Sequence, residues 1–488
     1  MRAVLTNEFS PREHYDVCVV GAGAAGITLA HKLRKNGLSV FLAEGGSDEF
    51  SDESQALYQG KVLGGEYFDL DVARLRYFGG TTNHWGGMCR PLEAHDFLPK
   101  AAAPNSGWPI RREDLAVYFP EAATILEIPE PPPDTILNDE RTLRRVHFVF
   151  SPPVRFAEKF GPVFAADDGM QLCLNCNLVG AEFEGELVRK LIFKNYHGHQ
   201  IAIAAKCFVI ACGGIENSRL LLHLNRTFSD ALGNQRGNVG RYWMEHPTHT
   251  IGDFLICGNL AFPDDEAYLP LSRDRLYLAP TPAFLDREKI MNCRIRFDRV
   301  GHGAAGQMLT SGLCSLPASV EQNLAAMAGG SLSMGWVRAS WEQEPLWSNR
   351  VALGDEVDAF GVPRPVLHWQ RSEQVKRTLQ KVALEAATYF ARQNTGRVRL
   401  HDWVLSQEPI FSCEGGGHCP GGYHHMGGTR MADSAEAGVT DRNCRVFGTR
   451  NLFVAGSSLF PSTGYCNPTT TIVQLALRLG DHLTKLAI

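Results

Sequence analysis

The feature that most constrains this chain is a glycine-rich turn close to its start. Residues 15–20, YDVCVV, form a β-rich run that leads into GAGAAG, where Gly21, Gly23 and Gly26 have G-x-G-x-x-G spacing. An amphipathic segment, ITLAHKLRKNG, follows, and then a second apolar run, SVFLAE, which ends at Glu44. This order predicts a β-α-β unit that binds a dinucleotide, with Glu44 accepting hydrogen bonds from a ribose.

Each glycine has a separate physical task in such a turn. Gly21 permits the tight turn, Gly23 lets a pyrophosphate approach the backbone, and Gly26 lets helix and strand pack closely. The start of the helix, at Ala24 and Ala25, faces the phosphate charge with its backbone N–H groups. The strand before the motif and the helix after it favour this interpretation over a purely structural glycine turn.

Composition limits the class of protein further. A chain of 488 residues can form two domains with a large core, and 21% charged with 44% hydrophobic residues is typical of globular proteins. The formal net charge of -5 and the lack of a long basic run argue against a nucleic-acid partner. No run of about 18 apolar residues is found, so no membrane span is expected.

The cysteines bear on the compartment. The 13 cysteines are scattered, and the N-terminal residues lack the apolar core of a signal peptide. We therefore expect reduced thiols and a cytoplasmic location. Export together with a partner subunit that carries its own signal is an open alternative.

A second glycine-rich stretch, GGTTNHWGG at residues 79–87, suits a backbone that passes close to a flat ring. From here the chain resembles the glucose–methanol–choline (GMC) flavoprotein oxidoreductases, most closely the pyranose oxidase and fructose dehydrogenase side of that family. The resemblance implies FAD as cofactor. The residues that it implies along the flavin are Gly79, Gly80, Thr81, Thr82, Asn83, His84, Trp85 and Gly86.

One of these residues carries a further implication. In some family members a histidine four residues after the second glycine is bonded covalently to the 8α-methyl group of the flavin, and here that position is His84. The alternative is that His84 only packs against the dimethylbenzene edge of the flavin.

The last 70 residues strengthen the resemblance. In GGYHHMGGTRM, residues 421–431, His425 has the family spacing of histidine, two residues and Gly-Thr, and Asn467 in CNPTTTI matches the second catalytic position. Pro468 and Thr469 fit the flavin-facing turn. The strand in NLFVAGSS ends at Gly456, where a second backbone approach to the cofactor is expected.

The implied chemistry is the oxidation of an alcohol, with hydride passing to flavin N5 and a proton to a base. A neutral imidazole is a good proton acceptor, and an amide can hold and orient the same hydroxyl. We therefore predict His425 as the base and Asn467 as the orienting partner. The adjacent His424 is expected to point elsewhere, because neighbouring side chains alternate in extended backbone.

A metal site is not expected in this region. Cys413, His418, Cys419, His424 and His425 lie close together in sequence, but C-x5-C is not a usual zinc spacing. A disulfide between Cys413 and Cys419 is the other alternative to free thiols.

The predicted fold is α/β, or α+β overall. It has a Rossmann-like FAD-binding domain (1–97, 166–249 and 430–488) and a discontinuous substrate domain (98–165 and 250–429) built on an antiparallel sheet and helices. An amphipathic helix, EQVKRTLQKVALEAATYFARQ, is expected to support that sheet. Its predicted apolar stripe is Val375, Leu379, Val382, Leu384 and Ala386.

The leading hypothesis is an FAD-dependent enzyme that oxidises a hydroxyl of a sugar, glycoside or polyol and passes electrons to O2 or to another redox carrier. The substrate could also be a natural-product alcohol that is not a sugar. Two alternatives are a non-redox lyase on the same fold and a flavin subunit that only relays electrons. Reduction of the flavin by substrate separates the oxidoreductase from the lyase.

Overall fold

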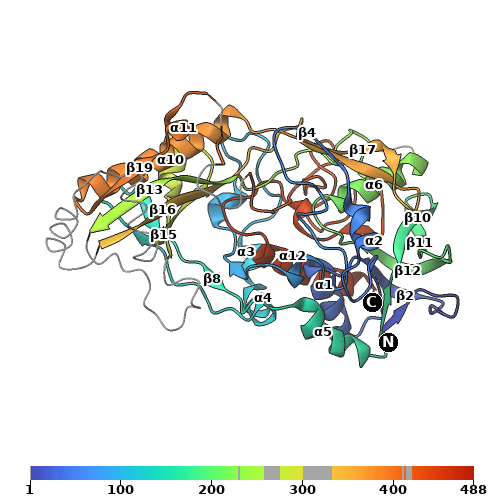
Figure 1. The fold of residues 1–488 in the computed structure, drawn as a ribbon. Coiled ribbons are helices and arrows are strands. Elements are labelled where there is room, and N and C mark those ends of the chain that lie inside the picture. Colours follow the sequence, from blue (N-terminus) through green and yellow to red (C-terminus); the bar gives the residue numbers. More distant parts are fainter. Residues whose placement is uncertain are drawn as a thin grey trace.

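The structure is a computed structural model that describes residues 2–228, 231–257, 275–299, 332–408, 411–413 and 420–487. Two large sheets organise the described chain, one beside the two termini and one at the opposite end of the molecule (Figure 1). The mixture of a largely parallel sheet with helices and an antiparallel sheet confirms the predicted fold class.

The first sheet has eight strands and contains the predicted β-α-β unit. β2 (Tyr15–Val20) leads into α1 (Ala24–Lys35), and β3 (Val40–Ala43) returns parallel to β2. Both strands are almost wholly buried, as expected for parallel strands covered on both faces. The other strands are β1 (Arg2–Val4), β9 (Met170–Leu174), β10 (Asn177–Glu184), β11 (Leu187–Lys194), β12 (Gln200–Ile210) and β20 (Leu452–Val454).

The C-terminal helix completes this part of the fold. α12 (Thr469–Ala487) packs along α1, so the end of the chain lies against its beginning (Figure 1). The start of α12 directly follows Asn467 and Pro468. The packing therefore carries the second predicted catalytic position to the glycine turn.

The second sheet is antiparallel and has seven strands. Its members are β6 (Thr135–Ile136), β7 (Leu143–Arg145), β13 (Thr248–Cys257), β14 (Arg275–Pro280), β15 (Cys293–Arg299), β16 (Leu332–Trp341) and β19 (Gly396–Leu400). Both sheets thus take strands from separated stretches of the chain, while the limits of the two domains stay a prediction.

One face of the second sheet is covered by α10 (Glu373–Arg392), the predicted amphipathic helix. Val375, Leu379, Val382 and Ala386 are buried in one core with the sheet. Leu384 is 47% exposed, so its assignment to the apolar stripe was wrong. It follows Val382 by two residues, which places it about 200° around the helix, on the solvent side.

Smaller elements join the sheets. β4 (Lys61–Gly64), β17 (Arg350–Val357) and β18 (Pro363–Trp369) form a three-stranded sheet, and β5 (Met88–Cys89) pairs with β8 (Val149–Phe150). The remaining helices are α2 (Asp52–Gln55), α3 (Glu113–Ala116), α4 (Phe119–Leu126), α5 (Phe156–Ala165), α6 (Glu216–Phe228), α7 (Pro282–Glu288) and α11 (Asp402–Leu405).

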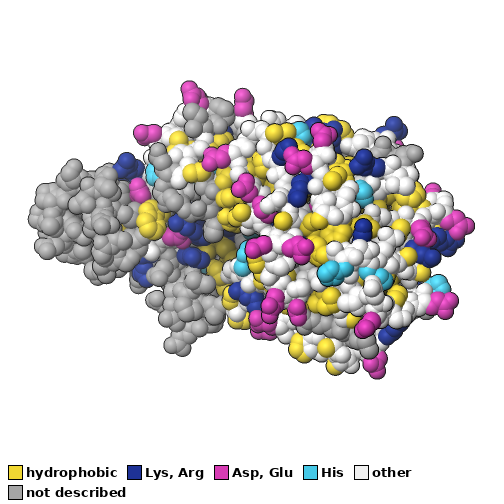
Figure 2. All heavy atoms as spheres, turned by 45° about the vertical axis from the view of Figure 1, so that its right-hand side comes forward, with side chains coloured by type: hydrophobic (Ala, Val, Ile, Leu, Met, Phe, Trp, Pro, Cys, Tyr) yellow, Lys and Arg dark blue, Asp and Glu magenta, His cyan; other side chains and the backbone are white. Residues whose placement is uncertain are grey.

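On the face of the molecule drawn in Figure 2, acidic, basic and apolar side chains are interspersed over the described residues. None of the described helices is long and apolar enough to cross a membrane.

Candidate active site

A cavity of about 800 Å³ brings the separated motifs together. Its lining comes from the first glycine turn, the stretch after residue 79, the C-terminal segment and the second sheet. The predicted site residues that line it are Gly21, Gly23, Ala24, Ala25, Glu44, Gly80, Thr81, Thr82, His84, Trp85, Gly86, His425, Gly456, Asn467, Pro468 and Thr469. Gly26, Gly79 and Asn83 are not part of this lining.

The first glycine turn has the geometry that each glycine was expected to provide. Gly21 has a φ of 99°, and a Cβ there would lie 2.7 Å from the carbonyl oxygen of Ala211. A Cβ on Gly26 would lie 1.8 Å from the oxygen of Gly21. A Cβ on Gly23 would meet nothing within 4 Å, so the backbone there is open to a ligand.

The start of α1 offers an anion site beside that open backbone. Gly23 is the N-cap residue and contributes no side-chain cap, so the first N–H groups of the helix are available to a phosphate. Glu44 is 6% exposed at the cavity wall, and its two carboxylate oxygens each accept a backbone N–H at 2.9 Å, from Ala22 and Gly46. These residues fit the pyrophosphate and a ribose of FAD.

The second glycine stretch packs directly on the first. Gly79 and Gly80 have φ values of 95° and 54°, and a Cβ on Gly80 would lie 3.1 Å from the Cα of Gly23. His84 follows this turn and is exposed at the cavity wall. Burial, and then the charge of Arg155, lowers the pKa of His84, which favours the neutral imidazole.

The C-terminal segment places His424, rather than His425, beside Asn467. His424 Nε2 lies 3.3 Å from Asn467 Nδ2, and Asn467 Oδ1 accepts a hydrogen bond from Arg294 Nη1 at 2.8 Å. His424 Nδ1 lies 2.9 Å from Nδ1 of His246. Asn467 is half-buried, and Arg294 and His246 are buried.

These contacts define a consistent tautomer for His424. The amide N–H of Asn467 can only donate, so Nε2 of His424 must be the unprotonated nitrogen. Nδ1 then carries the proton and donates it to His246. Nε2 of His424 thus accepts the amide N–H of Asn467 with its ring lone pair.

The ring of His425 has different surroundings. It packs between Tyr67 and Trp243, with ring centroids 6.2 Å and 5.8 Å away, and its Nε2 is buried without a hydrogen-bond partner. Burial, with a smaller effect from Arg74, lowers its pKa to about 3. The expectation that the two histidine rings diverge agrees with these contacts, but the ring that meets Asn467 is the one expected to point elsewhere.

Glu245 holds the backbone of both neighbouring histidine segments. Its Oε1 accepts N–H groups of His246 and His424, each at 2.7 Å, and its Oε2 accepts the hydroxyl of Tyr67. The side chain is fully buried, and burial raises its pKa to about 7. The carboxylate therefore fixes where the ring of His424 can sit.

Arg294 is a site residue that the sequence interpretation missed. Its side chain is nearly buried, and its guanidinium lies over the ring of Phe148 at 4.7 Å. Burial lowers its pKa to about 10, so the group stays a cation at neutral pH. The alternation RIRFDR at residues 294–299 was the available signal, because it places charged side chains on one face of an otherwise buried strand.

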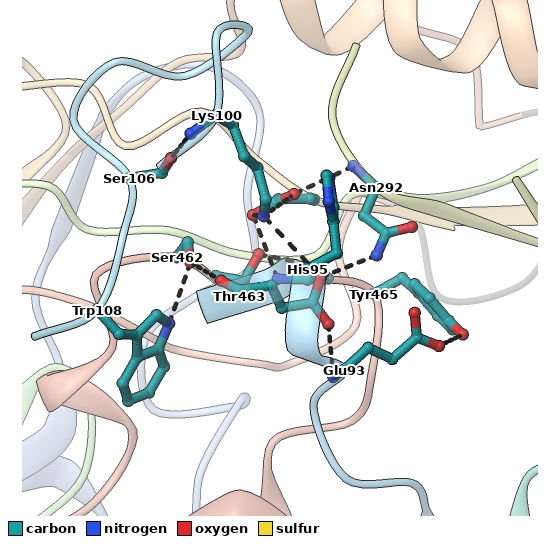
Figure 3. Close-up of polar contacts among 12 residues, drawn as sticks. Glu93, His95, Lys100, Ser106, Trp108, Asn292, Ser462, Thr463 and Tyr465 are labelled. Carbon is teal, nitrogen blue, oxygen red and sulfur yellow. Dashed lines mark hydrogen bonds and ion pairs between the residues drawn. The ribbon is translucent and has the colours of Figure 1, made fainter. Parts of the chain in front are cut away.

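A buried polar network anchors the segment that carries Asn467 (Figure 3). Lys100 Nζ lies 2.6 Å and 2.8 Å from the two carboxylate oxygens of Glu342. Glu342 also accepts the backbone N–H of Gly464 at 3.3 Å, and Ser462 donates to the carbonyl of Asp96 at 2.7 Å. The turn just before Asn467 is thus held by charged groups from distant parts of the chain.

The described residues contain no group of three or more metal-binding side chains. Two residues of the metal alternative, His418 and Cys419, lie outside the described residues. Cys413 is disulfide-bonded, whereas nine other cysteines in the described ranges are free thiols. The reduced state expected for all thiols therefore does not hold for Cys413.

Comparisons with known proteins agree with this site. Residues 345–476 match the model of the GMC oxidoreductase family, and residues 16–56 match an FAD binding domain. The fold and site thus define an FAD-dependent oxidoreductase. Its C-terminal part, residues 345–476, is similar to the GMC oxidoreductases.

Relatives and solved structures extend the likeness to the full chain. The chain is 27% identical to 2-methyl-1,2-propanediol dehydrogenase of Mycolicibacterium austroafricanum, over 59% of this chain and 49% of that one. It is 22% identical to the fructose dehydrogenase large subunit of Gluconobacter japonicus, over 96% and 97%. The crystal structure of pyridoxine 4-oxidase from Mesorbium loti has the same fold, with a TM-score of 0.55 and 15% identity over 96% and 99%.

Proposed function

We propose that this protein oxidises a CH–OH group of a sugar, glycoside or polyol. The observation that carries the proposal is the contact of His424 with Asn467, which in turn accepts a hydrogen bond from Arg294. The relatives include dehydrogenases named for a diol and for fructose, which supports a substrate rich in hydroxyl groups and does not favour a lyase.

FAD supplies the acceptor for the hydride in this chemistry. Gly21, Gly23 and the start of α1 would hold its pyrophosphate, Glu44 a ribose, and the stretch at 79–86 the flavin side. Attachment of the flavin through His84 is part of this proposal, because that imidazole is exposed to the cavity and its lowered pKa leaves the nucleophilic form dominant.

The proton of the substrate hydroxyl needs a base next to the amide that orients it. We assign this role to His424, since its Nε2 lies at Asn467, although sequence spacing predicted His425. His425 is the weaker candidate because burial lowers its pKa to about 3, which makes it a poor proton acceptor. Arg294 stabilises the negative charge that develops on the substrate oxygen.

His246 and Glu245 act on the base without touching the substrate. His246 accepts a hydrogen bond from Nδ1–H of His424 and so keeps Nε2 unprotonated. The substrate hydroxyl would replace the amide N–H of Asn467 as the donor to that nitrogen. Glu245 binds the backbone N–H of both residues and fixes their spacing. Both are positioning residues in this mechanism.

The deciding experiment is anaerobic bleaching of the flavin by a panel of sugars, glycosides and polyols. With a substrate that bleaches it, we expect His424→Ala to slow reduction by roughly 10²–10⁴-fold while the flavin stays bound. His425→Ala is the matched comparison. If His425→Ala loses the reaction and His424→Ala keeps it, the base is His425, and if no panel member bleaches the flavin, the proposed function fails.

The electron acceptor is proposed to be O2 or a separate redox carrier. A cytoplasmic location is supported by the nine free thiols of the described chain, against the disulfide at Cys413. Oxygen consumption during turnover distinguishes the acceptors, because a dehydrogenase would be reduced by substrate and yet reoxidise slowly in air.

A further inference from the structure

The cavity face of the second sheet is unusually rich in arginine. Along β15, Ile295 and Phe297 point into the core against α10, so Arg294, Arg296 and Asp298 occupy the opposite face. Arg294 and Arg296 both line the cavity that contains His424 and Asn467. Strand alternation thus directs this row of charges toward the reaction centre.

Neighbouring strands add two more guanidinium groups to the same face. Arg338 on β16 is opposite Arg296, and Arg275 on β14 is opposite Asp298. Both arginines line the cavity as well. We call Arg275, Arg296 and Arg338 the arginine cluster.

Among the residues that the structure describes, one carboxylate, that of Asp298, lies within 4 Å of every member of the arginine cluster. Nε of Arg296 lies 2.8 Å from an oxygen of Asp298, while the Nε atoms of Arg338 and Arg275 lie 3.4 Å and 3.5 Å from the carboxylate. Within the described ranges, these three cations against one anion leave a net positive charge. Burial, and then the charge of Arg296, lowers the pKa of Arg338, which is the direction expected for crowded like charges.

Arg294 adds a further positive charge to this face of the sheet and contacts Asn467 directly. Its hydrogen-bond acceptor is the neutral amide of Asn467, and no carboxylate pairs with it within 4 Å in the described parts of the chain. Arg294 is a buried cation, which is costly without an anion, and the partly exposed arginine cluster adds positive charge on the same face, so together they favour a negatively charged ligand.

We propose that the substrate of this enzyme is an anionic sugar, a hydroxyl compound that carries a carboxylate or phosphate group. The anionic group binds the arginine cluster while the reacting hydroxyl lies at His424 and Asn467. Guanidinium groups suit this task, because their planar fork pairs with two oxygens of a carboxylate or phosphate. This inference rests on the proposed alcohol oxidation and specifies its substrate class.

The test compares matched sugars on the holoenzyme. Glucuronate and glucose 6-phosphate are measured against glucose and methyl glucoside by the rate of anaerobic flavin bleaching. We expect kcat/KM to be roughly 10- to 100-fold higher for at least one anionic sugar, with a KM that rises with salt. Preference for glucuronate assigns the site to carboxylates, and preference for glucose 6-phosphate assigns it to phosphates.

Two outcomes overturn the inference, and they are distinguishable. If neutral sugars bleach the flavin as well as anionic ones do, alcohol oxidation stands and the anionic substrate class is wrong. If neither these sugars nor any polyol of the wider panel bleaches the flavin, the proposed function fails, and the inference that rests on it fails too.

Variants identify the groups responsible. Arg296→Gln and Arg338→Gln should each reduce the preference for the anionic sugar about tenfold or more, mainly by raising its KM. Arg189→Gln is the matched control, because Arg189 lies on β11 of the other sheet with a side chain 52% exposed. An unchanged preference in both cluster variants contradicts the proposal.

A ligand without a hydroxyl separates binding from turnover. Cyclohexanecarboxylate should compete with the anionic sugar and should bind more weakly to Arg296→Gln, whereas cyclohexanecarboxamide should compete poorly with the wild type. Equal inhibition by the acid and the amide would mean that charge is not recognised at this face.

Discussion

The buried ion pair between Lys100 and Glu342 offers a quantitative test of how the active-site segment is held. Their side chains are 3% and 1% exposed, and Asp96 lies 3.9 Å from the same ammonium group. The change Lys100→Met keeps a similar volume but leaves two buried carboxyl groups without their cation. Glu342 would lose the partner that lowers its pKa against the effect of burial.

The expected magnitude follows from the cost of an uncompensated buried charge. Removal of one partner of a buried pair costs about 3–5 kcal/mol in the free energy of unfolding. An unfolding entropy of roughly 2.1 cal/mol/K per residue gives about 1 kcal/mol/K for this chain. The thermal midpoint should therefore fall by about 3–5 °C.

The effect should extend to catalysis, because Glu342 also binds the backbone N–H of Gly464, three residues before Asn467. Calorimetry and the rate of flavin reduction are measured on Lys100→Met and on the double variant Lys100→Met/Glu342→Gln. The double variant should regain part of the stability, because it removes the stranded charge. A single variant as stable as the wild type, or a double variant that loses the sum of both effects, would refute the reasoning.

Four further substitutions test other parts of the site. Gly26→Ala should prevent the protein from folding with FAD, because its Cβ would lie 1.8 Å from the oxygen of Gly21. Gly23→Ala should fold and bind FAD more weakly, because a Cβ there meets no protein atom within 4 Å. Circular dichroism measures folding in both variants, and the FAD content measures cofactor binding. His84→Ala should release all flavin on acid precipitation, and flavin that stays with the protein would contradict the covalent link. Burial raises the pKa of Glu245 to about 7, so the wild type should lose stability as pH rises from 4.5 to about 7. Glu245→Gln lacks this ionisation and should gain on the order of 3 kcal/mol relative to the wild type over that range. Thermal midpoints of the two proteins that run parallel across that range would contradict this reasoning.

The β-α-β unit could be predicted from sequence because its constraints are local. Gly21 needs a positive φ and Gly26 needs close packing, and both demands are met by neighbours within a few residues or by the adjacent strand. The amphipathic helix α10 was predicted for the same reason, since helical periodicity is a local property. Leu384 marks the limit, because its position two residues after Val382 breaks that periodicity.

The choice between the two histidines was not local. Tyr423 has a φ of 59°, so the backbone turns just before the pair, and counting along the chain does not say which ring faces the cavity. Our proposal of His424 depends on its contact with His246, which is 178 residues away. Family spacing alone selected His425, whose ring lies between Tyr67 and Trp243.

By itself, the sequence predicted an FAD site at a glycine turn and a resemblance to alcohol-oxidising flavoproteins, because the motifs that carry both are short. The tertiary structure alone decided which side chains from distant parts of the chain line the cavity together. Arg294 and Asn467 are 173 residues apart and meet only when the second sheet packs against the C-terminal segment. Charge at the reaction centre is therefore a property of that packing, since strands far apart in the chain contribute each arginine.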